Sequence, residues 1–268
     1  MTNTDFTDAP VRLRAGTIEV WVDAAHGGRL ASMRVEGREF LVSADSHDPM
    51  LWGAYPMVPF AGRVRNGVLR FGNSEHRLRL NASPHSIHGS VFDAPWTVQS
   101  VSDTSVVLRC PLGDEWPWGG TVHHAVTVTT DSVQCELTVT AAGHSMPAQV
   151  GWHPWFVPET TVTWRFGAML ARDNAGITTA QRVVAPTGDV DDCFVEPLEW
   201  PRVALGDTVL EMRSDCSHWV VFDQMDRGTC VEPQSGAPNG VNDDPVVLNA
   251  GESLTRWMEW RLVARDEP

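Results

Sequence analysis

The chain has 268 residues, 42% of them hydrophobic, and its 20 residues of the Lys+Arg class are all arginine. A chain of this length can bury a substantial core, and all-β chains of this size commonly form one domain, so we expect a single domain over residues 1–268. The lack of lysine excludes Schiff-base chemistry, a lysine general base and the P-loop phosphate cradle.

The formal net charge of −14 and the pI near 5.0 argue against nucleic acid and anionic membranes as partners, because both attract concentrated positive charge. A neutral, soluble small molecule fits this charge better. The five cysteines are scattered without a C-x-x-C pair, which favours reduced thiols over disulfides or a zinc site. We find no secretory signal and no apolar stretch of membrane-spanning length, and therefore expect a cytoplasmic protein.

Short alternating runs of Val, Thr, Leu and Trp recur between Gly, Asp, Asn and Pro, and long helical periodicity is missing. This pattern is typical of an all-β chain. It predicts a strand at 17–22, then a hairpin of 31–35 with 38–42 that turns at 36–37, and a hairpin of 68–71 with 76–80 that turns at 72–73.

The clearest hairpin joins 122–129 to 133–140 at Asp131 and Ser132. Its apolar side chains alternate with threonines, so one face of each strand is apolar and the hairpin should lie centrally in a sheet. Later strands are predicted at 203–210, 218–222 and 255–263, with loop-rich segments at 171–190 and 235–251. Many short strands with one apolar face each indicate packed antiparallel sheets.

Four short motifs place polar side chains among turn-like residues. They are GRVRNG at 62–67, HSIHG at 85–89, GWHPWF at 151–156 and CVEPQ at 230–234. Two imidazoles and a carboxylate on separate segments form a set of acids and bases without an obvious nucleophile. Taken singly, each has an ordinary structural explanation, such as a core histidine, a surface glutamate or a salt-bridged arginine.

Together the motifs resemble those of the aldose 1-epimerase (galactose mutarotase) family, in the family's order along nearly the whole chain. The resemblance implies a large antiparallel β-sandwich of the galactose mutarotase-like type, formed by residues 1–268. It also implies an enzyme that interconverts the α and β anomers of a free hexose by acid–base ring opening and closure. Such an enzyme needs no cofactor, and we expect a monomer or homodimer with a small-molecule sugar as its partner.

The resemblance assigns three proton-handling residues. His153 matches the histidine that donates a proton to the sugar ring oxygen, and Glu232 matches the general base that takes the proton of the anomeric hydroxyl. Burial should raise the pKa of Glu232 towards the working pH. His88 matches the histidine that hydrogen-bonds near the ring oxygen. Although His85 and His88 are spaced as a metal-binding pair could be, no third ligand follows at a recognisable spacing, so we expect no metal site.

Three more residues match substrate contacts of the family. Arg63 matches an arginine that contacts sugar hydroxyls, with Arg65 as the alternative. Asp191 matches an aspartate that binds distal hydroxyls, but Asp192 stands where the family commonly has histidine and could take this role. Trp155 stands where the family often has tyrosine and should keep an aromatic wall for the sugar.

Two other functions stay open at this point. A hexose-6-phosphate 1-epimerase of the same fold would need a cluster of arginines around the phosphate, and only Arg63 and Arg65 lie together near a motif. A non-catalytic carbohydrate-binding module would use the same pocket without turning the sugar over. The presence of both Glu232 and His153 disfavours that module, because binding alone does not require a matched acid and base.

Overall fold

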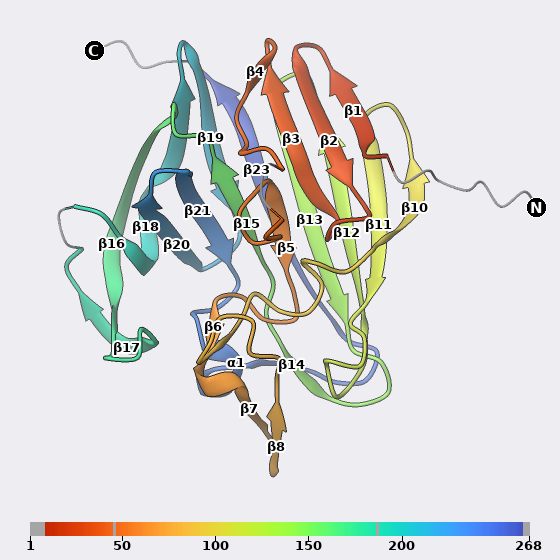
Figure 1. Ribbon diagram of the computed structural model, residues 1–268, viewed down its shortest axis with the longest axis vertical. Coiled ribbons are helices and arrows are strands. Elements are labelled where there is room, and N and C mark those ends of the chain that lie inside the picture. The colour runs from red at the N-terminus through yellow and green to blue at the C-terminus, as the bar shows by residue number, and fades with distance from the viewer. Residues whose placement is uncertain (1–8, 45–46, 186–187, 265–268) are drawn as a thin grey trace, which may run out of the picture.

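The computed structural model describes residues 9–44, 47–185 and 188–264, and these residues form an almost entirely β structure (Figure 1). The elements in chain order are β1 (Val11–Ala15), β2 (Ile18–Asp23), β3 (Arg29–Val35), β4 (Arg38–Glu39), β5 (Ala54–Met57), β6 (Arg63–Val64), η1 (Arg65–Gly67), β7 (Val68–Phe71), β8 (Ser74–Arg77), β9 (Ser86–Ile87), β10 (Thr97–Val101), β11 (Ser105–Pro111), β12 (Thr121–Val128), β13 (Ser132–Thr140), β14 (Met146–Ala148), β15 (Gly151–Phe156), β16 (Thr161–Arg172), β17 (Thr178–Val183), β18 (Asp191–Leu205), β19 (Thr208–Ser214), β20 (His218–Met225), β21 (Gly228–Gln234), α1 (Gly240–Asp243), β22 (Val246–Leu248) and β23 (Ser253–Val263). None of the described helices is long and apolar enough to cross a bilayer.

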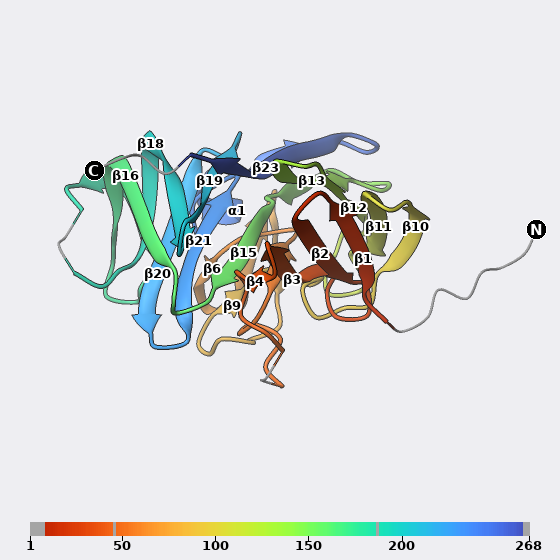
Figure 2. The same cartoon turned by 90° about the horizontal axis from the view of Figure 1, so that it is seen from above.

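Antiparallel pairing links most strands into one large sheet that folds over on itself. Its order is β10-β11-β12-β13-β23-β19-β18-β20-β21-β15-β5-β3-β2-β1. The long strand β18 makes the fold-over possible, because Asp191–Val195 pair with β20 while Arg202–Leu205 pair with β19. Figure 2 shows β1, β2 and β3 facing β11, β12 and β13 across the core. The all-β antiparallel sandwich expected from the sequence is confirmed.

The core between the two layers follows from alternation along the strands. In β12 every second residue is buried, and Val126 and Val128 meet Leu137 and Val139 of β13 in the core, as predicted. The hairpin lies centrally, since β11 pairs with β12 and β23 with β13. All five cysteines are unpaired and buried, so the structure holds them as thiols.

Two central strands are buried on both faces. Every residue of β15 is buried, and so are the last five residues of β21. Trp152 and Val231 point into the hydrophobic core, because strand side chains alternate between faces. Their neighbours point to the opposite, concave face of the sheet, which is covered by loops. The site described below lies on that face.

Some strand boundaries differ from those expected. The predicted strand at 203–210 is wrong, because Gly206 and Asp207 form a two-residue turn that ends β18 at Leu205 and begins β19 at Thr208. The segment 171–190, expected as loop, contains the end of β16 and all of β17. The segment 38–42 keeps only the two-residue β4 and an isolated bridge between Leu41 and Phe156.

Candidate active site

The register between β15 and β21 brings the GWHPWF motif and the CVEPQ motif into one site. Gly151 pairs with Gln234 and Trp155 with Cys230, so the position midway places His153 opposite Glu232. Residues opposite one another in a sheet, and residues two apart in one strand, share a face. The side chains of His153, Trp155, Cys230, Glu232 and Gln234 therefore all point to the concave face.

The same face continues across the neighbouring strands in two rows. One row runs from Tyr55 of β5 through His153 and Glu232 to Val220 of β20. The second row runs from Trp155 through Cys230 and Phe222 to Asp191, the first residue of β18. Trp155 and Asp191 thus reach the same concave surface from strands that lie three positions apart in the sheet.

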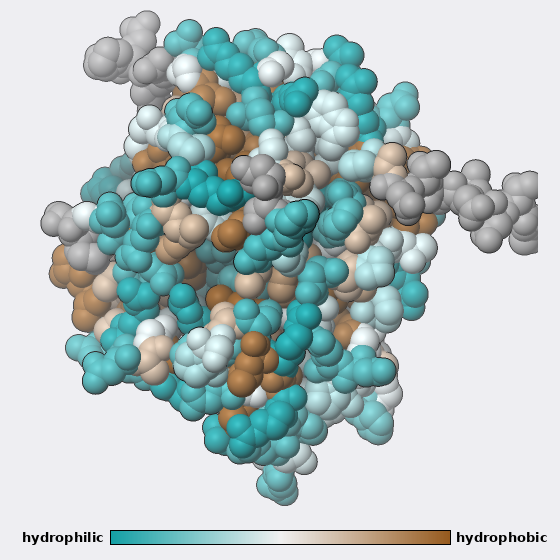
Figure 3. Space-filling view, viewed as in Figure 1, coloured by the Kyte–Doolittle hydropathy of each residue, from teal (hydrophilic) through white to brown (hydrophobic). Residues whose placement is uncertain are grey.

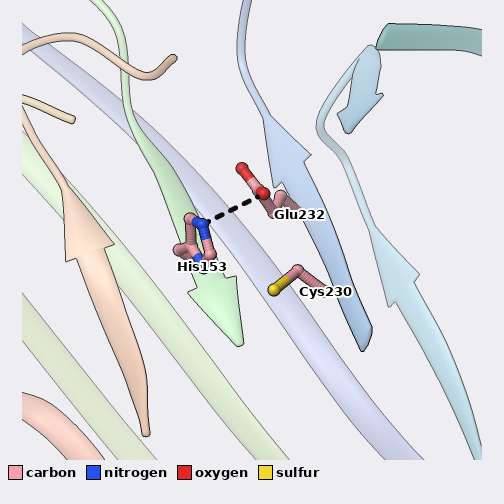
Figure 4. Close-up of side chains that lie close together, drawn as sticks. All are labelled: His153, Cys230 and Glu232. Carbon is pink, nitrogen blue, oxygen red and sulfur yellow. Dashed lines mark ion pairs between the residues drawn. The ribbon is translucent and has the colours of Figure 1, made fainter. Parts of the chain in front are cut away.

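His153 and Glu232 form a buried pair. His153 Nε2 lies 3.2 Å from Glu232 Oε1, and Figure 4 shows the two side chains pointing towards one another from β15 and β21. Gln234 Nε2 donates a 2.9 Å hydrogen bond to Glu232 Oε2, which fixes the plane of the carboxyl group. One carboxyl oxygen of Glu232 is therefore held by the Gln234 amide, and the other faces the His153 imidazole.

Burial shifts the pKa values of both partners towards their neutral forms. It lowers the pKa of His153 from 6.5 to about 3, and Arg29 adds to the decrease. Burial also raises the pKa of Glu232 well above 4.5, and the charge of Asp191 raises it further against the opposing effects of Gln234 and Arg63. The direction expected for Glu232 is confirmed. The pair therefore favours a single proton, which either partner can carry across their contact.

His88 lies against His153 from a separate loop. The ring centroids of these two histidines are 4.9 Å apart at 82°, and Tyr55 stacks on His153 at 4.7 Å and 17°. His88 adopts φ +62 and is followed by Gly89 at φ +79, whose hypothetical Cβ would lie 2.0 Å from the carbonyl oxygen of Val58. Glycine is therefore required at position 89, and the tight turn directs the His88 ring into the site. Burial, together with His153 and Arg63, lowers the pKa of His88 well below 6.5.

A cavity of about 230 Å³ opens above the pair, and all six residues predicted for the site line it. These residues are Arg63, His88, His153, Trp155, Asp191 and Glu232. The face of the molecule in Figure 3 is mainly hydrophilic, with apolar surface in separate patches. A small polar molecule with one apolar face would match the cavity, because Trp155 offers a ring and the other five offer hydrogen-bonding groups.

The geometry separates the alternatives that the sequence left open. Arg63 Nη2 donates to Asp191 Oδ2 at 3.2 Å, and both side chains line the cavity. In contrast, Arg65 pairs with Asp173, and Asp192 Oδ1 lies 2.8 Å from Nε of Arg172 outside the cavity lining. The structure thus places Arg63 and Asp191 at the cavity.

Several residues at the site carried no clear signal in the sequence. Tyr55 packs on His153, and Arg172 Nη1 donates to Asp191 Oδ2 at 3.0 Å. Gln234 could have been found, because it is two residues after Glu232 in the same strand and so shares its face. Tyr55 is the one tyrosine of the chain, but its neighbours gave no reason to place it at the site. The position of Arg172 depends on the pairing of β16 with β18.

Arg29 fixes the loop over the cavity from beneath. Its guanidinium group is fully buried and donates to the carbonyl oxygens of Pro49, Trp52 and Phe92 at 2.7 to 2.9 Å. It also lies 4.0 Å from the ring centroid of Trp52. Burial lowers the pKa of Arg29 to about 10, which leaves it charged at neutral pH. This buried cation therefore holds the loop by ion–dipole and cation–π contacts.

The residues available for a metal differ from the pair weighed in the sequence. Both ring nitrogens of His85 are engaged with the backbone, Nδ1 with the N–H of Asn66 and Nε2 with the carbonyl of Ala175, each at 3.0 Å. Donor atoms of His153, Cys230 and Glu232 instead lie within 4.8 Å of one another. This set occupies the floor of the site.

A larger hollow of about 400 Å³ lies over β12, β13 and β23 around Trp257. Its described lining includes the carboxylates Glu136 and Glu259 and the amide Gln134, but no histidine. The smaller cavity, where a carboxyl group and two imidazoles converge, is therefore the candidate site for acid–base chemistry.

Comparison with known proteins agrees with the sequence motifs. The family model described as aldose 1-epimerase matches residues 11–261. The uncharacterised protein YphB of Escherichia coli strain K12 is 25% identical over 246 residues, covering 78% of this chain and 83% of YphB. The GalM/aldose epimerase homologue of C. elegans is 14% identical with a TM-score of 0.85, covering 97% of this chain and all of that one.

The crystal structure of galactose 1-epimerase from Lactobacillus acidophilus NCFM is also similar, with 16% identity, a TM-score of 0.80 and coverage of 98% of this chain and 97% of that one. At these identities the two solved structures show a shared fold, whereas the family model spans most of the sequence. The resemblance stated from the four motifs is confirmed. The chain belongs to the aldose 1-epimerase family.

Proposed function

We propose that the protein interconverts the α and β anomers of a free hexose. The observation that carries this proposal is the 3.2 Å contact between His153 Nε2 and Glu232 Oε1 on the floor of the cavity. A hemiacetal carbon bears the ring oxygen and the anomeric hydroxyl, so a catalyst must reach two oxygens on one carbon. Two adjacent proton-transfer atoms suit this geometry.

Ring opening begins when the proton of the pair moves from Glu232 to His153 across their 3.2 Å contact. Glu232 then takes the proton of the anomeric hydroxyl while His153 protonates the ring oxygen, and the C1–O bond to the ring breaks. The aldehyde end turns about the C1–C2 bond, and the two residues reverse their roles as the ring closes. Each proton transfer contributes roughly 10²- to 10⁴-fold to the rate. The pKa shifts support this scheme, because the open-chain stage leaves both residues in their favoured neutral forms.

The remaining cavity residues orient the sugar in this scheme. Arg63 and Asp191 offer a donor and an acceptor for hydroxyl groups, and Trp155 offers an aromatic face for the C–H groups of the ring. His88 is placed to donate or accept a hydrogen bond beside His153. A neutral sugar fits these contacts, because both arginines that reach Asp191 are already paired with carboxylates.

The pairing of Arg63 and Arg172 with Asp191 disfavours a hexose 6-phosphate as the substrate, and the acid–base pair disfavours a non-catalytic sugar-binding module. A hexose 6-phosphate would have to draw Arg63 or Arg172 away from Asp191, and so break one of two partly exposed ion pairs. A binding module would not need the acid–base pair. Polarimetry or NMR of freshly dissolved α-glucose and α-galactose, with and without the protein, tests the proposal directly. Unchanged equilibration rates with clear sugar binding would favour the module.

A further inference from the structure

Cys230 completes a donor set that the proton-transfer scheme does not use. It lies two residues before Glu232 on β21 and opposite Trp155, so its thiol points to the same concave face as the acid–base pair. Figure 4 shows the sulfur beside His153 and Glu232, and the three donor atoms lie within 4.8 Å of one another. The thiol is fully buried and forms no disulfide.

The spacing of these donors is close to that of a tetrahedral metal site. Zinc bonds of about 2.0–2.2 Å to nitrogen and oxygen place those two ligand atoms about 3.4 Å apart, and a Zn–S bond of about 2.3 Å places sulfur about 3.5 Å from either. His153 Nε2 and Glu232 Oε1 are already 3.2 Å apart. Because all three donors lie within 4.8 Å of one another, the longest donor–donor distance needs to shorten by at most about 1.3 Å to close the set.

We propose that His153, Cys230 and Glu232 form a binding site for a thiophilic divalent cation such as Zn²⁺, and that the bound cation inhibits the enzyme. Three protein ligands leave a fourth position that faces the cavity and can hold water. As the metal binds, the thiol proton and the single proton held by the His153–Glu232 pair both leave to solvent, so a thiolate and a carboxylate balance the charge of the dication. Mg²⁺ and Ca²⁺ bind poorly here, because they prefer oxygen ligands.

Inhibition follows from the atoms that the cation occupies. A metal on His153 Nε2 and Glu232 takes the lone pairs that would otherwise accept and return the protons of the sugar. This consequence rests on the proposed epimerase function, whereas metal binding itself does not. Arg29 and Arg63 oppose a cation at the site and Asp191 favours it, so the ligand bonds decide the affinity.

Cobalt binding tests the site without any activity measurement. Protein freed of metal by a chelator is titrated with Co²⁺, and thiolate-to-cobalt charge-transfer absorption reports a bond to sulfur. We expect the wild type to bind one Co²⁺ with this absorption, and Cys230→Ser and Cys230→Ala to lose it and bind Co²⁺ at least about tenfold more weakly. The matched control is Cys193→Ser, which alters a buried thiol two strands away from Glu232, outside the donor set.

Inhibition is then measured with Zn²⁺, each protein being compared with its own metal-free rate. We expect wild type and Cys193→Ser to lose activity and regain it with EDTA, and the Cys230 variants to need at least about tenfold more Zn²⁺ for the same inhibition.

A wild type without the charge-transfer absorption, or a Cys230 variant that keeps it, overturns the metal site even if one variant fails to fold. Zinc binding without inhibition overturns the inhibitory role. Cobalt binding in a protein without epimerase activity would refute the proposed function alone.

Discussion

Replacing Glu232 by glutamine separates proton transfer from sugar binding. The amide keeps the size of the side chain, and its oxygen can still accept the hydrogen bond from Gln234. Its NH₂ group occupies the place of Oε1 and can donate to His153 Nε2, 3.2 Å away. The variant therefore keeps the shape of the site and loses the base.

We expect Glu232→Gln to lower kcat by roughly 10²- to 10⁴-fold, equivalent to about 3 to 5 kcal/mol of transition-state stabilisation. Sugar binding should stay within a few-fold of the wild type. Mutarotation of α-glucose gives the rate, and isothermal calorimetry gives the affinity. An equal loss of affinity and rate would show that Glu232 is a substrate contact and would refute the reasoning.

The same variant has a second, independent effect on stability. Burial raises the pKa of Glu232 in the folded protein above its ordinary value of 4.5. The stabilising contribution of the neutral carboxyl group is complete below pH 4.5 and is lost as the pH rises through the folded-state pKa. Glutamine does not titrate. As the pH rises through this range, the free energy of unfolding of Glu232→Gln should therefore increase relative to that of the wild type. Urea unfolding at a series of pH values measures it, and parallel curves would contradict the buried-acid assignment.

Four further outcomes are expected. His153→Gln should depress kcat with little change in circular dichroism, and activity near that of the wild type would shift the acid role to His88. Gly89→Ala should lose roughly 10²-fold in kcat/KM, because its Cβ would lie 2.0 Å from the carbonyl oxygen of Val58, whereas Gly72→Ala has a similar φ and open space and should only lose about 1–2 kcal/mol of stability. A chelator should leave the activity of the purified protein unreduced, and a loss restored by Zn²⁺ would show a metal requirement instead. Glucose and galactose should have a higher kcat/KM than glucose 6-phosphate, and a phosphate preference that weakens with salt would overturn the neutral-sugar assignment.

The parts of the fold that the sequence predicts are those with regular alternation. In the β12–β13 hairpin every valine and leucine is buried and each turn residue is polar, so local pattern and tertiary structure agree. The strand β18 could not be predicted in the same way. Its middle contains Glu196 and Pro197 and is largely exposed, and its two ends are paired with different strands. A pattern based on one buried face does not describe such a strand.

The candidate site was predicted through its motifs and not through its geometry. The resemblance named six residues that the structure places around one cavity, but the sequence does not contain the register that sets His153 opposite Glu232. Nor could it indicate Tyr55 or Arg172, whose positions depend on pairing between strands far apart in the chain. Gln234 is the exception, since alternation from Glu232 alone puts it on the same face.

The distribution of the site between sheet and loops has a consequence for how such proteins diverge. His153 and Glu232 lie on adjacent central strands, where backbone hydrogen bonds on both sides hold their spacing. Arg63 and His88 instead lie at or beside the short β6–β9 pairing, and Asp191 begins a strand. Mutations in these peripheral segments can change which hydroxyl pattern is accepted while the proton-transfer distance stays the same. Under the proposed function, new sugar preferences can therefore arise in this scaffold by loop replacement while the proton-transfer residues stay in place.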